Sequence, residues 1–176
     1  MRIIAGTHRG RRIEAPPGLG TRPTSDRVRE NVFNILGPVD DALVLDLYAG
    51  SGALGLEALS RGAARAVFVE RDAEALRAIE HNLDRLRLSG TVLRQDAMTV
   101  LAAEAVSGRK YDLVLVDPPY EMYPDIEPKL ARYLPSVLTD TGVLVVETDA
   151  RVAPSLPLEQ RTSRKYGSVR VTVYDG

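Results

Sequence analysis

Residues 42–55 read ALVLDLYAGSGALG, and this stretch decides the fold class. It begins as a continuous apolar run with one acid, Asp46, near its end, which is typical of a strand covered on both faces. A glycine-rich turn follows, and the next residues, 53–61, predict a helix. This order of strand, glycine turn and helix indicates a parallel sheet with helices packed on it.

The same alternation continues to the end of the chain. Apolar runs predict four further strands, at 66–69, 91–93, 111–116 and 143–147. Helical spacing of apolar residues predicts helices at 72–86, 97–106 and 125–134. Residues 158–174 predict two final strands that bend at Tyr166 and Gly167 and place an antiparallel strand in the sheet. We therefore expect a doubly wound α/β domain over residues 38–176, which binds ligands beyond the carboxyl ends of its strands.

The first 37 residues form a different kind of segment. Residues 1–24 are rich in Gly, Pro and Arg and predict short strands and turns, and a helix follows from about Asp26 to Leu36. Residues 1–36 contain seven Arg against three acidic residues, whereas the remainder contains 16 basic and 21 acidic residues. A basic extension on an acidic body indicates a polyanionic partner at the extension, and a solvated charged terminus is the alternative interpretation.

The composition excludes several kinds of site. The chain has no Cys, which rules out disulfides, thiolate catalysis and Cys-based zinc sites. Its two His, His8 and His81, lie far apart in sequence, so we expect no metal site. Purely apolar runs fall well short of the ~18 residues that span a bilayer, and the start lacks a secretory signal. We expect a cytoplasmic monomer without a membrane partner.

The glycine-rich turn predicts a cofactor site. Gly50, Gly52 and Gly55 match the dinucleotide-binding fingerprint, and Glu70 follows at the spacing of a ribose-binding acid, so a nicotinamide dehydrogenase competes as an interpretation. Asp46 favours S-adenosylmethionine, because its carboxylate would repel a pyrophosphate and attract a sulfonium and an ammonium group. The predicted cofactor-binding residues follow the first three strands: Asp46, Tyr48, Ala49, Gly50, Ser51, Gly52, Glu70, Arg71, Asp96 and Ala97.

The segment Asp117-Pro118-Pro119-Tyr120 follows the strand predicted at 111–116 and indicates the chemistry. Two successive prolines stiffen the backbone, so the Asp117 carboxylate and the Pro118 carbonyl can form a rigid pair of acceptors. Such a pair suits the exocyclic amine of a nucleobase, whose lone pair is delocalised into the ring. Tyr120 can stack on the base, and Asp117 can take up the released proton. We predict these four residues as catalytic, and a proline-rich turn that only closes the strand is the alternative.

Four segments of this sequence together resemble one family. They are residues 1–6 with 9–11, residues 21–24 with 26–30 and 33–36, residues 45–59, and residues 117–120. In this combination the chain resembles the RsmD family, the 16S ribosomal RNA guanine-N2 methyltransferases, over almost its whole length. The N-terminal combination is the specific part, since the last two segments recur among amino-methyltransferases. Two positions depart from the family pattern: Tyr48 stands where Phe is frequent, and Gln95 stands where Gly is common.

The resemblance implies a Rossmann-like, seven-stranded methyltransferase fold with S-adenosylmethionine as the methyl donor. It implies guanine-966 of 16S ribosomal RNA as the target, modified on a partly assembled small subunit. Within the cofactor site it implies Asp46, Gly50 and Gly52 at the methionine end, Glu70 on the ribose and Asp96 near the adenine.

Basic side chains predict where RNA phosphates bind. These residues are Arg9, Arg11, Arg12, Arg22 and Lys165, and their contacts would carry little sequence information.

Three alternative functions stay open besides the dehydrogenase. A DNA amino-methyltransferase could use the same loop, and a protein-glutamine methyltransferase usually has Asn in place of Asp117. A non-catalytic RNA-binding or ribosome assembly factor is the third, although the intact loop argues against it.

Overall fold

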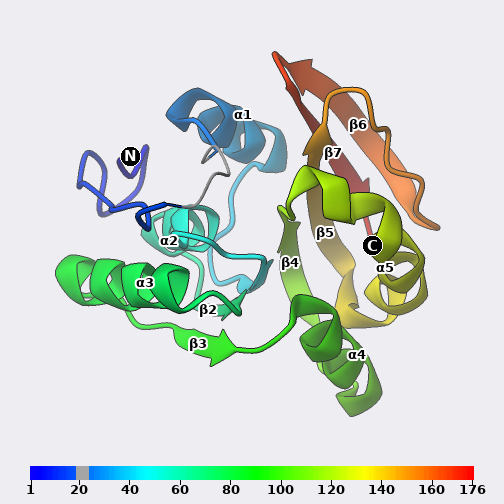
Figure 1. The fold of residues 1–176 in the computed structure, drawn as a ribbon, viewed down its shortest axis with the longest axis horizontal. Coiled ribbons are helices and arrows are strands. Elements are labelled where there is room, and N and C mark those ends of the chain that lie inside the picture. The colour runs from blue at the N-terminus through cyan, green and yellow to red at the C-terminus, as the bar shows by residue number, and fades with distance from the viewer. Residues whose placement is uncertain (19–23) are drawn as a thin grey trace.

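The computed structural model describes residues 1–18 and 24–176, so the predicted phosphate contact Arg22 lies outside the described residues. Seven strands form one sheet in the order β3-β2-β1-β4-β5-β7-β6, with helices on both faces (Figure 1). The strands are β1 (Leu43–Leu47), β2 (Arg65–Glu70), β3 (Thr91–Arg94), β4 (Tyr111–Val116), β5 (Leu138–Asp149), β6 (Glu159–Tyr166) and β7 (Val169–Asp175). The helices are α1 (Asp26–Leu36), α2 (Ala53–Ser60), α3 (Ala73–Leu86), α4 (Ala97–Ser107) and α5 (Tyr123–Val137), and η1 (Tyr120–Met122) is a short 3-10 turn.

The order and direction of the strands confirm the predicted sheet. Strands β1 to β5 are mutually parallel, and β7 pairs antiparallel with both β5 and β6. The chain order reverses between β1 and β4, and a topological switch point of this kind is where doubly wound sheets bind ligands. Among the described residues, no helix is both long and apolar enough to cross a membrane.

The central strands bury alternate side chains on opposite faces. Val44 and Leu113 belong to the apolar cluster that contains residues of α1, α2 and α3, whereas Leu45 and Val114 belong to the cluster with α4 and α5 (Figure 1). Because side chains alternate along a strand, Asp46 shares the face of Val44. Its carboxylate therefore points toward the start of α2.

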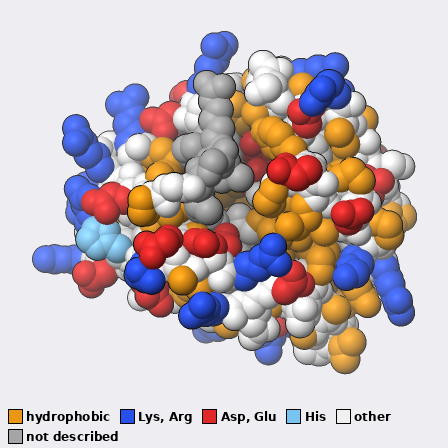
Figure 2. Space-filling view, viewed as in Figure 1, with side chains coloured by type: hydrophobic (Ala, Val, Ile, Leu, Met, Phe, Trp, Pro, Cys, Tyr) orange, Lys and Arg blue, Asp and Glu red, His pale blue; other side chains and the backbone are white. Residues whose placement is uncertain are grey.

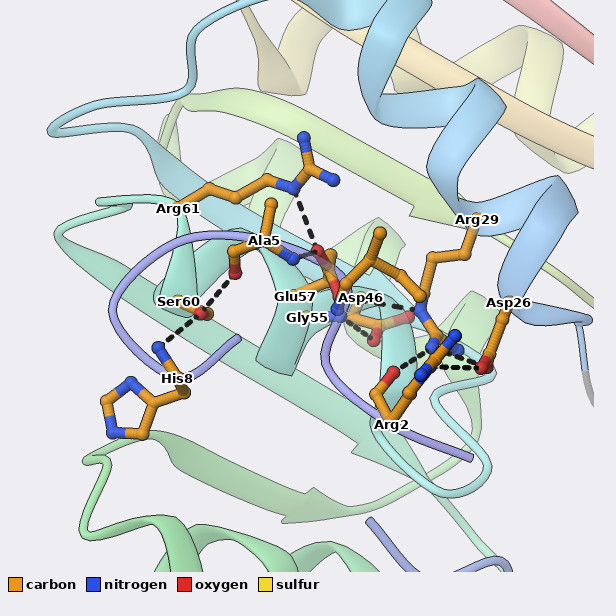
Figure 3. Close-up of polar contacts among 11 residues, drawn as sticks. Arg2, Ala5, His8, Asp26, Arg29, Asp46, Gly55, Glu57, Ser60 and Arg61 are labelled. Carbon is orange, nitrogen blue, oxygen red and sulfur yellow. Dashed lines mark hydrogen bonds and ion pairs between the residues drawn. The ribbon is translucent and has the colours of Figure 1, made fainter. Parts of the chain in front are cut away.

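The start of the chain is held against α2 by a buried carboxylate (Figure 3). The backbone amides of Ile4 and Ala5 donate to the two oxygens of Glu57, at 2.9 Å and 3.0 Å. Arg61 Nε lies 2.8 Å from Glu57 Oε1, and Arg29 Nε lies 3.5 Å from Glu57 Oε2. The Glu57 and Arg29 side chains are both fully buried. Glu57 is thus shared by two cations, of which Arg29 also pairs with Asp26, and the N-terminal segment depends on the Glu57 carboxylate.

A second buried side chain connects the extension to the glycine turn. Asn82 of α3 donates through Nδ2 to the carbonyl oxygens of Glu14 and Ser51, at 2.9 Å and 3.0 Å. Its Oδ1 accepts from the Glu14 amide at 2.8 Å. Asn82 therefore fixes the segment before residue 18 beside residues 50–52, so that the extension forms one wall of the cavity described below.

We expect Glu57→Gln to lower the free energy of unfolding by about 3 kcal/mol, because it removes the negative partner of Arg61 and leaves the buried Arg29 with less counter-charge. Urea denaturation followed by circular dichroism measures the change. The matched control is Glu74→Gln, which removes an exposed i,i+3 pair with Arg77 and should cost less than about 0.5 kcal/mol. Equal losses in the two variants would contradict the importance of the buried cluster.

Two elements are longer than the sequence pattern predicts. Helix α5 begins at Tyr123 and continues through Pro135, where the pattern predicts an end. Its buried residues recur at helical spacing on both sides of that proline, and their packing outweighs the lost backbone hydrogen bond: Tyr123, Ile126, Leu130, Leu134 and Val137. Strand β5 begins at Leu138 rather than near 143, because Leu138 pairs with Tyr111 before a register shift whose extra residues lie in β5, between Leu138 and Val143.

Candidate functional site

A cavity of about 610 Å³ opens at the carboxyl ends of β1, β2, β4 and β5. This volume falls within the range of small-molecule and cofactor sites. Eleven of the predicted cofactor-binding and catalytic residues line it: Asp46, Tyr48, Ala49, Gly50, Ser51, Glu70, Arg71, Asp117, Pro118, Pro119 and Tyr120. The glycine turn and the proline loop, more than 60 residues apart in sequence, therefore form one cavity.

The glycine turn adopts a backbone that its sequence requires. Gly52 has φ 80°, in the left-handed region that favours glycine, and it precedes the first residue of α2. A Cβ on Gly55 would lie 2.4 Å from Cε1 of Phe68 and 3.0 Å from Oδ2 of Asp46. Glycine at position 55 thus lets α2 approach both β2 and the Asp46 carboxylate, and the Gly55 amide donates to Asp46 Oδ2 at 3.0 Å.

Asp46 is a buried carboxylate that faces the cavity. Its residue is 1% exposed, and among the described residues it forms no ion pair. Burial raises the pKa of Asp46 to about 8; the Gly55 amide opposes this shift, and nearby Asp117 and Glu70 add to it. A cationic ligand would supply the missing counter-charge. The hydroxyl of Tyr48, which also lines the cavity, is buried without a hydrogen-bond partner among the described residues.

Glu70 organises the turn that follows β2. Its Oε2 accepts from the Gly50 amide at 3.0 Å, and its Oε1 accepts from the amides of Arg71 and Asp72 at 2.8 Å and 3.0 Å. The carboxylate therefore links the glycine turn to the start of α3. It also lines the cavity, where its oxygens can accept from hydroxyl groups of a ligand.

Asp117, in the proline loop, lies beside two residues that we did not predict for the site, Thr24 and Glu147. Thr24 Oγ1 lies 3.0 Å from Oδ2 of Asp117 and 3.0 Å from Oε2 of Glu147. The Tyr120 hydroxyl donates to Oε1 of Glu147 at 3.5 Å. Burial raises the pKa of Asp117 to about 6, although the Thr24 hydrogen bond opposes the shift. Burial, followed by repulsion from Asp117, raises the pKa of Glu147 well above its usual value.

The sequence carried a signal for Glu147 but none for Thr24. Glu147 ends the apolar run of β5 as Asp46 ends that of β1, and its burial at the carboxyl end of a strand follows from the same pattern. Thr24 reaches the site through the fold of the N-terminal segment, 93 residues from Asp117 in sequence. Contacts over this separation depend on tertiary packing, which local patterns do not encode.

Several predicted site residues lie outside the cavity lining. Gly52 is the N-cap residue of α2, and Ala97 is buried in α4. Asp96 is exposed and caps α4, accepting from the Thr99 amide at 2.9 Å, although its charge acts on Tyr48 at the cavity. Lys165, on the edge strand β6, also lies outside the lining.

The predicted phosphate-binding arginines of the extension are solvent-exposed: Arg9, Arg11 and Arg12. Of these, Arg11 donates to the carbonyl oxygen of Arg85 at 3.0 Å. Basic side chains project from the side of the molecule where Figure 1 shows the N-terminus, with acidic side chains among them, and both kinds also occur elsewhere on the same face (Figure 2).

Comparison with known proteins agrees with this architecture. A family model described as conserved hypothetical protein 95 matches residues 1–175. The chain is 39% identical over 185 residues to "Putative rRNA methyltransferase YlbH" of Bacillus subtilis, covering 99% of this chain and 98% of that protein. It is 48% identical over 122 residues to "Ribosomal RNA small subunit methyltransferase D" of Escherichia coli, covering 68% of this chain and 60% of that protein. The chain belongs to the RsmD family.

A solved structure supports the same conclusion. The Escherichia coli protein described as "Putative methyltransferase yhhF" superposes on this RsmD-family chain with a TM-score of 0.85. The two sequences are 37% identical, and the match covers 99% of this chain and 97% of the other. The two chains therefore share one fold over nearly their whole length.

Proposed function

We propose that this protein transfers a methyl group from S-adenosylmethionine to the exocyclic N2 of a guanine in 16S ribosomal RNA. By resemblance the target is guanine-966, on a partly assembled small subunit. One observation carries the proposal: Asp46 and Asp117 line the same cavity. The Asp46 carboxylate suits a cationic cofactor, and the rigid loop that bears Asp117 suits an amine. The names of the relatives support ribosomal RNA as the substrate class.

The residues of the cavity fit the proposed cofactor. Asp46 would bind the cationic methionine end, which would return the buried carboxylate to its ionised form. The Tyr48 hydroxyl, buried without a partner among the described residues, is free to bind a polar group there. Glu70 would accept from the ribose hydroxyls, and Asp96 would lie toward the adenine. The bound cofactor supplies an activated methyl group on its sulfonium.

The proline loop would prepare the amine for attack. Asp117 and the Pro118 carbonyl would accept from the two N–H groups of the guanine amine, which frees its lone pair. Tyr120 would stack on the base and fix its orientation, and Pro119 keeps the loop extended, with φ −51° and ψ 133°. Holding both reactants in one geometry accelerates transfer by raising their effective concentration. Asp117 would then take up the proton that the amine releases.

A transfer assay separates the proposed substrate from its alternatives. Labelled S-adenosylmethionine would be incubated with the protein and, in parallel, with small subunits that lack the modification, duplex DNA, and a glutamine-bearing protein substrate. We expect label in RNA alone. Label in DNA or protein would favour one of the other methyltransferases, and RNA binding without any transfer would favour a non-catalytic assembly factor.

We propose residues 1–37 as an RNA-binding extension of the catalytic domain, and its arginines give a direct test. Replacing Arg9, Arg11 and Arg12 by Gln should weaken RNA binding and reduce the dependence of log K on log salt by about two, since each lost phosphate contact contributes about 0.7 to 0.9. Filter binding at a series of salt concentrations measures both quantities.

The control for this test removes three basic side chains elsewhere. Arg109, Lys110 and Lys129 are exposed and lie away from the extension, and their replacement by Gln changes the net charge equally. The control should leave the salt dependence close to that of the wild type. An unchanged slope in the extension variant would exclude these arginines from the RNA interface.

A further inference from the structure

The Thr24 hydroxyl bridges two carboxylates, and the number of hydrogens in this bridge is informative. Oγ1 lies 3.0 Å from an oxygen of Asp117 and 3.0 Å from an oxygen of Glu147. A threonine hydroxyl carries one hydrogen, so it donates to one carboxylate only. The second contact is a hydrogen bond only if the other carboxyl group is protonated and donates to Oγ1. Both contacts can be hydrogen bonds at once only if the bridge holds one proton more than two ionised carboxylates would.

The surroundings of the two acids indicate where that proton lies. Glu147 is 5% exposed, its other oxygen accepts from Tyr120, and it forms no ion pair within residues 1–18 and 24–176. Asp117 is partly exposed at the mouth of the cavity, where the proposed amine would lie. A charge costs more free energy at the more deeply buried position, so burial favours Glu147 over Asp117 as the carboxyl group that keeps the proton.

We propose that Glu147 and Thr24 are positioning residues for Asp117: protonated Glu147 donates to Thr24, and Thr24 donates to Asp117, which stays ionised and correctly oriented to accept from the substrate amine. The part that concerns the amine rests on the function proposed above. The same chain also orients the base-stacking residue, because the second carboxyl oxygen of Glu147, Oε1, accepts from the Tyr120 hydroxyl.

Acidic and phenolic groups surround this hydrogen-bonded chain. Asp117, Tyr120 and Asp46 line the cavity, whereas Asp149 of β5 lies outside the lining and acts on Tyr120 through its charge. Strand β7 presents Val171 beside Glu147 in the pairing register. Within the described residues no basic side chain pairs with Glu147 or Asp117, so the shared proton is what limits their mutual repulsion.

Glu147→Gln gives the sharpest test, because an amide mimics the protonated acid. Its NH₂ group can donate to Thr24 and its oxygen can accept from Tyr120. We expect the carboxyl of Asp117, followed by ¹³C NMR in the ligand-free protein, to titrate within about half a pH unit of the wild type. If Glu147 were ionised in the wild type, removing its charge would lower the pKa of Asp117 by about one unit or more, and this result would overturn the proposal.

Infrared spectroscopy reports the proton itself. Because buried Asp46, with its pKa raised to about 8, is also a protonated acid at neutral pH, the measurement is made in an Asp46→Asn background. In that background the protein should show at neutral pH the C=O band of a buried carboxylic acid, and adding Glu147→Gln should remove it. Glu159→Gln, at an exposed position of β6, is the matched control and should leave the band in place. Persistence of the band in Glu147→Gln would overturn the assignment. If the variant does not fold, titration of Glu147 in the wild type by NMR replaces it, and an ionised Glu147 at neutral pH would overturn the assignment equally.

Activity completes the test. Glu147→Gln should transfer methyl groups at a rate within about tenfold of the wild type. Its rate should still fall at acidic pH. It should no longer fall at alkaline pH, where the wild type loses activity as Glu147 gives up its proton. Glu147→Leu and Thr24→Val, which break the chain, should fall about a hundredfold, and Thr24→Ser should restore most of the rate. Equal activity of Gln and Leu at position 147 would contradict the donor role. An inactive wild type with the expected spectra would refute the proposed function and leave the hydrogen-bonded chain standing.

Discussion

Asp117→Ala should lower the rate of methyl transfer by about a thousandfold while the protein still binds S-adenosylmethionine. The reason is that Asp117 would both hold the amine and accept its proton, and a positioned acid or base contributes about 10²- to 10⁴-fold. Asp117 is held at the cavity mouth by Pro118 and by the 3.0 Å contact to Thr24. No other described residue is an obvious substitute for it at that place. Single-turnover transfer to RNA measures the rate, and calorimetry measures cofactor binding.

The control for this variant is Asp125→Ala, which removes an exposed carboxylate from the first turn of α5. It should leave the rate within about twofold of the wild type, as expected for a surface change. Transfer by Asp117→Ala at more than about a tenth of the wild-type rate would remove Asp117 from the catalytic role, whatever the binding data show.

Asp46→Asn should weaken the binding of S-adenosylmethionine by about tenfold to a hundredfold, the usual contribution of a hydrogen bond to a charged group. The loss should depend on pH. Burial raises the pKa of Asp46 to about 8, and only the ionised carboxylate attracts a cation. Below pH 8 the wild-type protein must lose a proton when the ligand binds, so its advantage over the variant should grow as the pH rises toward 8 and then level off.

The ratio of the two dissociation constants is the useful quantity, because effects of pH that are common to both proteins cancel in it. Calorimetry from pH 6 to pH 9 gives the ratio, and Asp125→Asn serves as a control that should stay near one throughout. A ratio near one for Asp46→Asn would contradict its role at the cofactor. A large ratio that does not vary with pH would contradict the raised pKa.

The predicted fold was correct where local patterns and packing agree. Helix α1 spans Asp26–Leu36 as predicted, since Ser25 caps it and Gly37 ends it with φ 75°. Asp72 caps α3 in the same way, accepting from the Ala75 amide. The pattern was wrong about the length of α5: it predicted a helix at 125–134, whereas the buried face of the helix extends from Tyr123 to Val137.

Two of the predicted site residues lie at one cavity because both stand at the ends of apolar runs. Asp46 and Asp117 each follow such a run, and parallel strands bring their carboxyl ends to one edge of the sheet. The hydrogen-bond partner of Asp117 could not be predicted, because Thr24 comes from the extension and meets β4 and β5 only after the extension packs. Whether the predicted residues perform their assigned roles stays a prediction.

The identity of the methylated nucleoside tests the central claim most directly. Small subunits that lack the modification would be treated with the protein and labelled S-adenosylmethionine, and the 16S ribosomal RNA would be digested to nucleosides and separated. We predict label in N2-methylguanosine, mapping to guanine-966. Label in any other nucleoside, or in ribosomal protein, would contradict it.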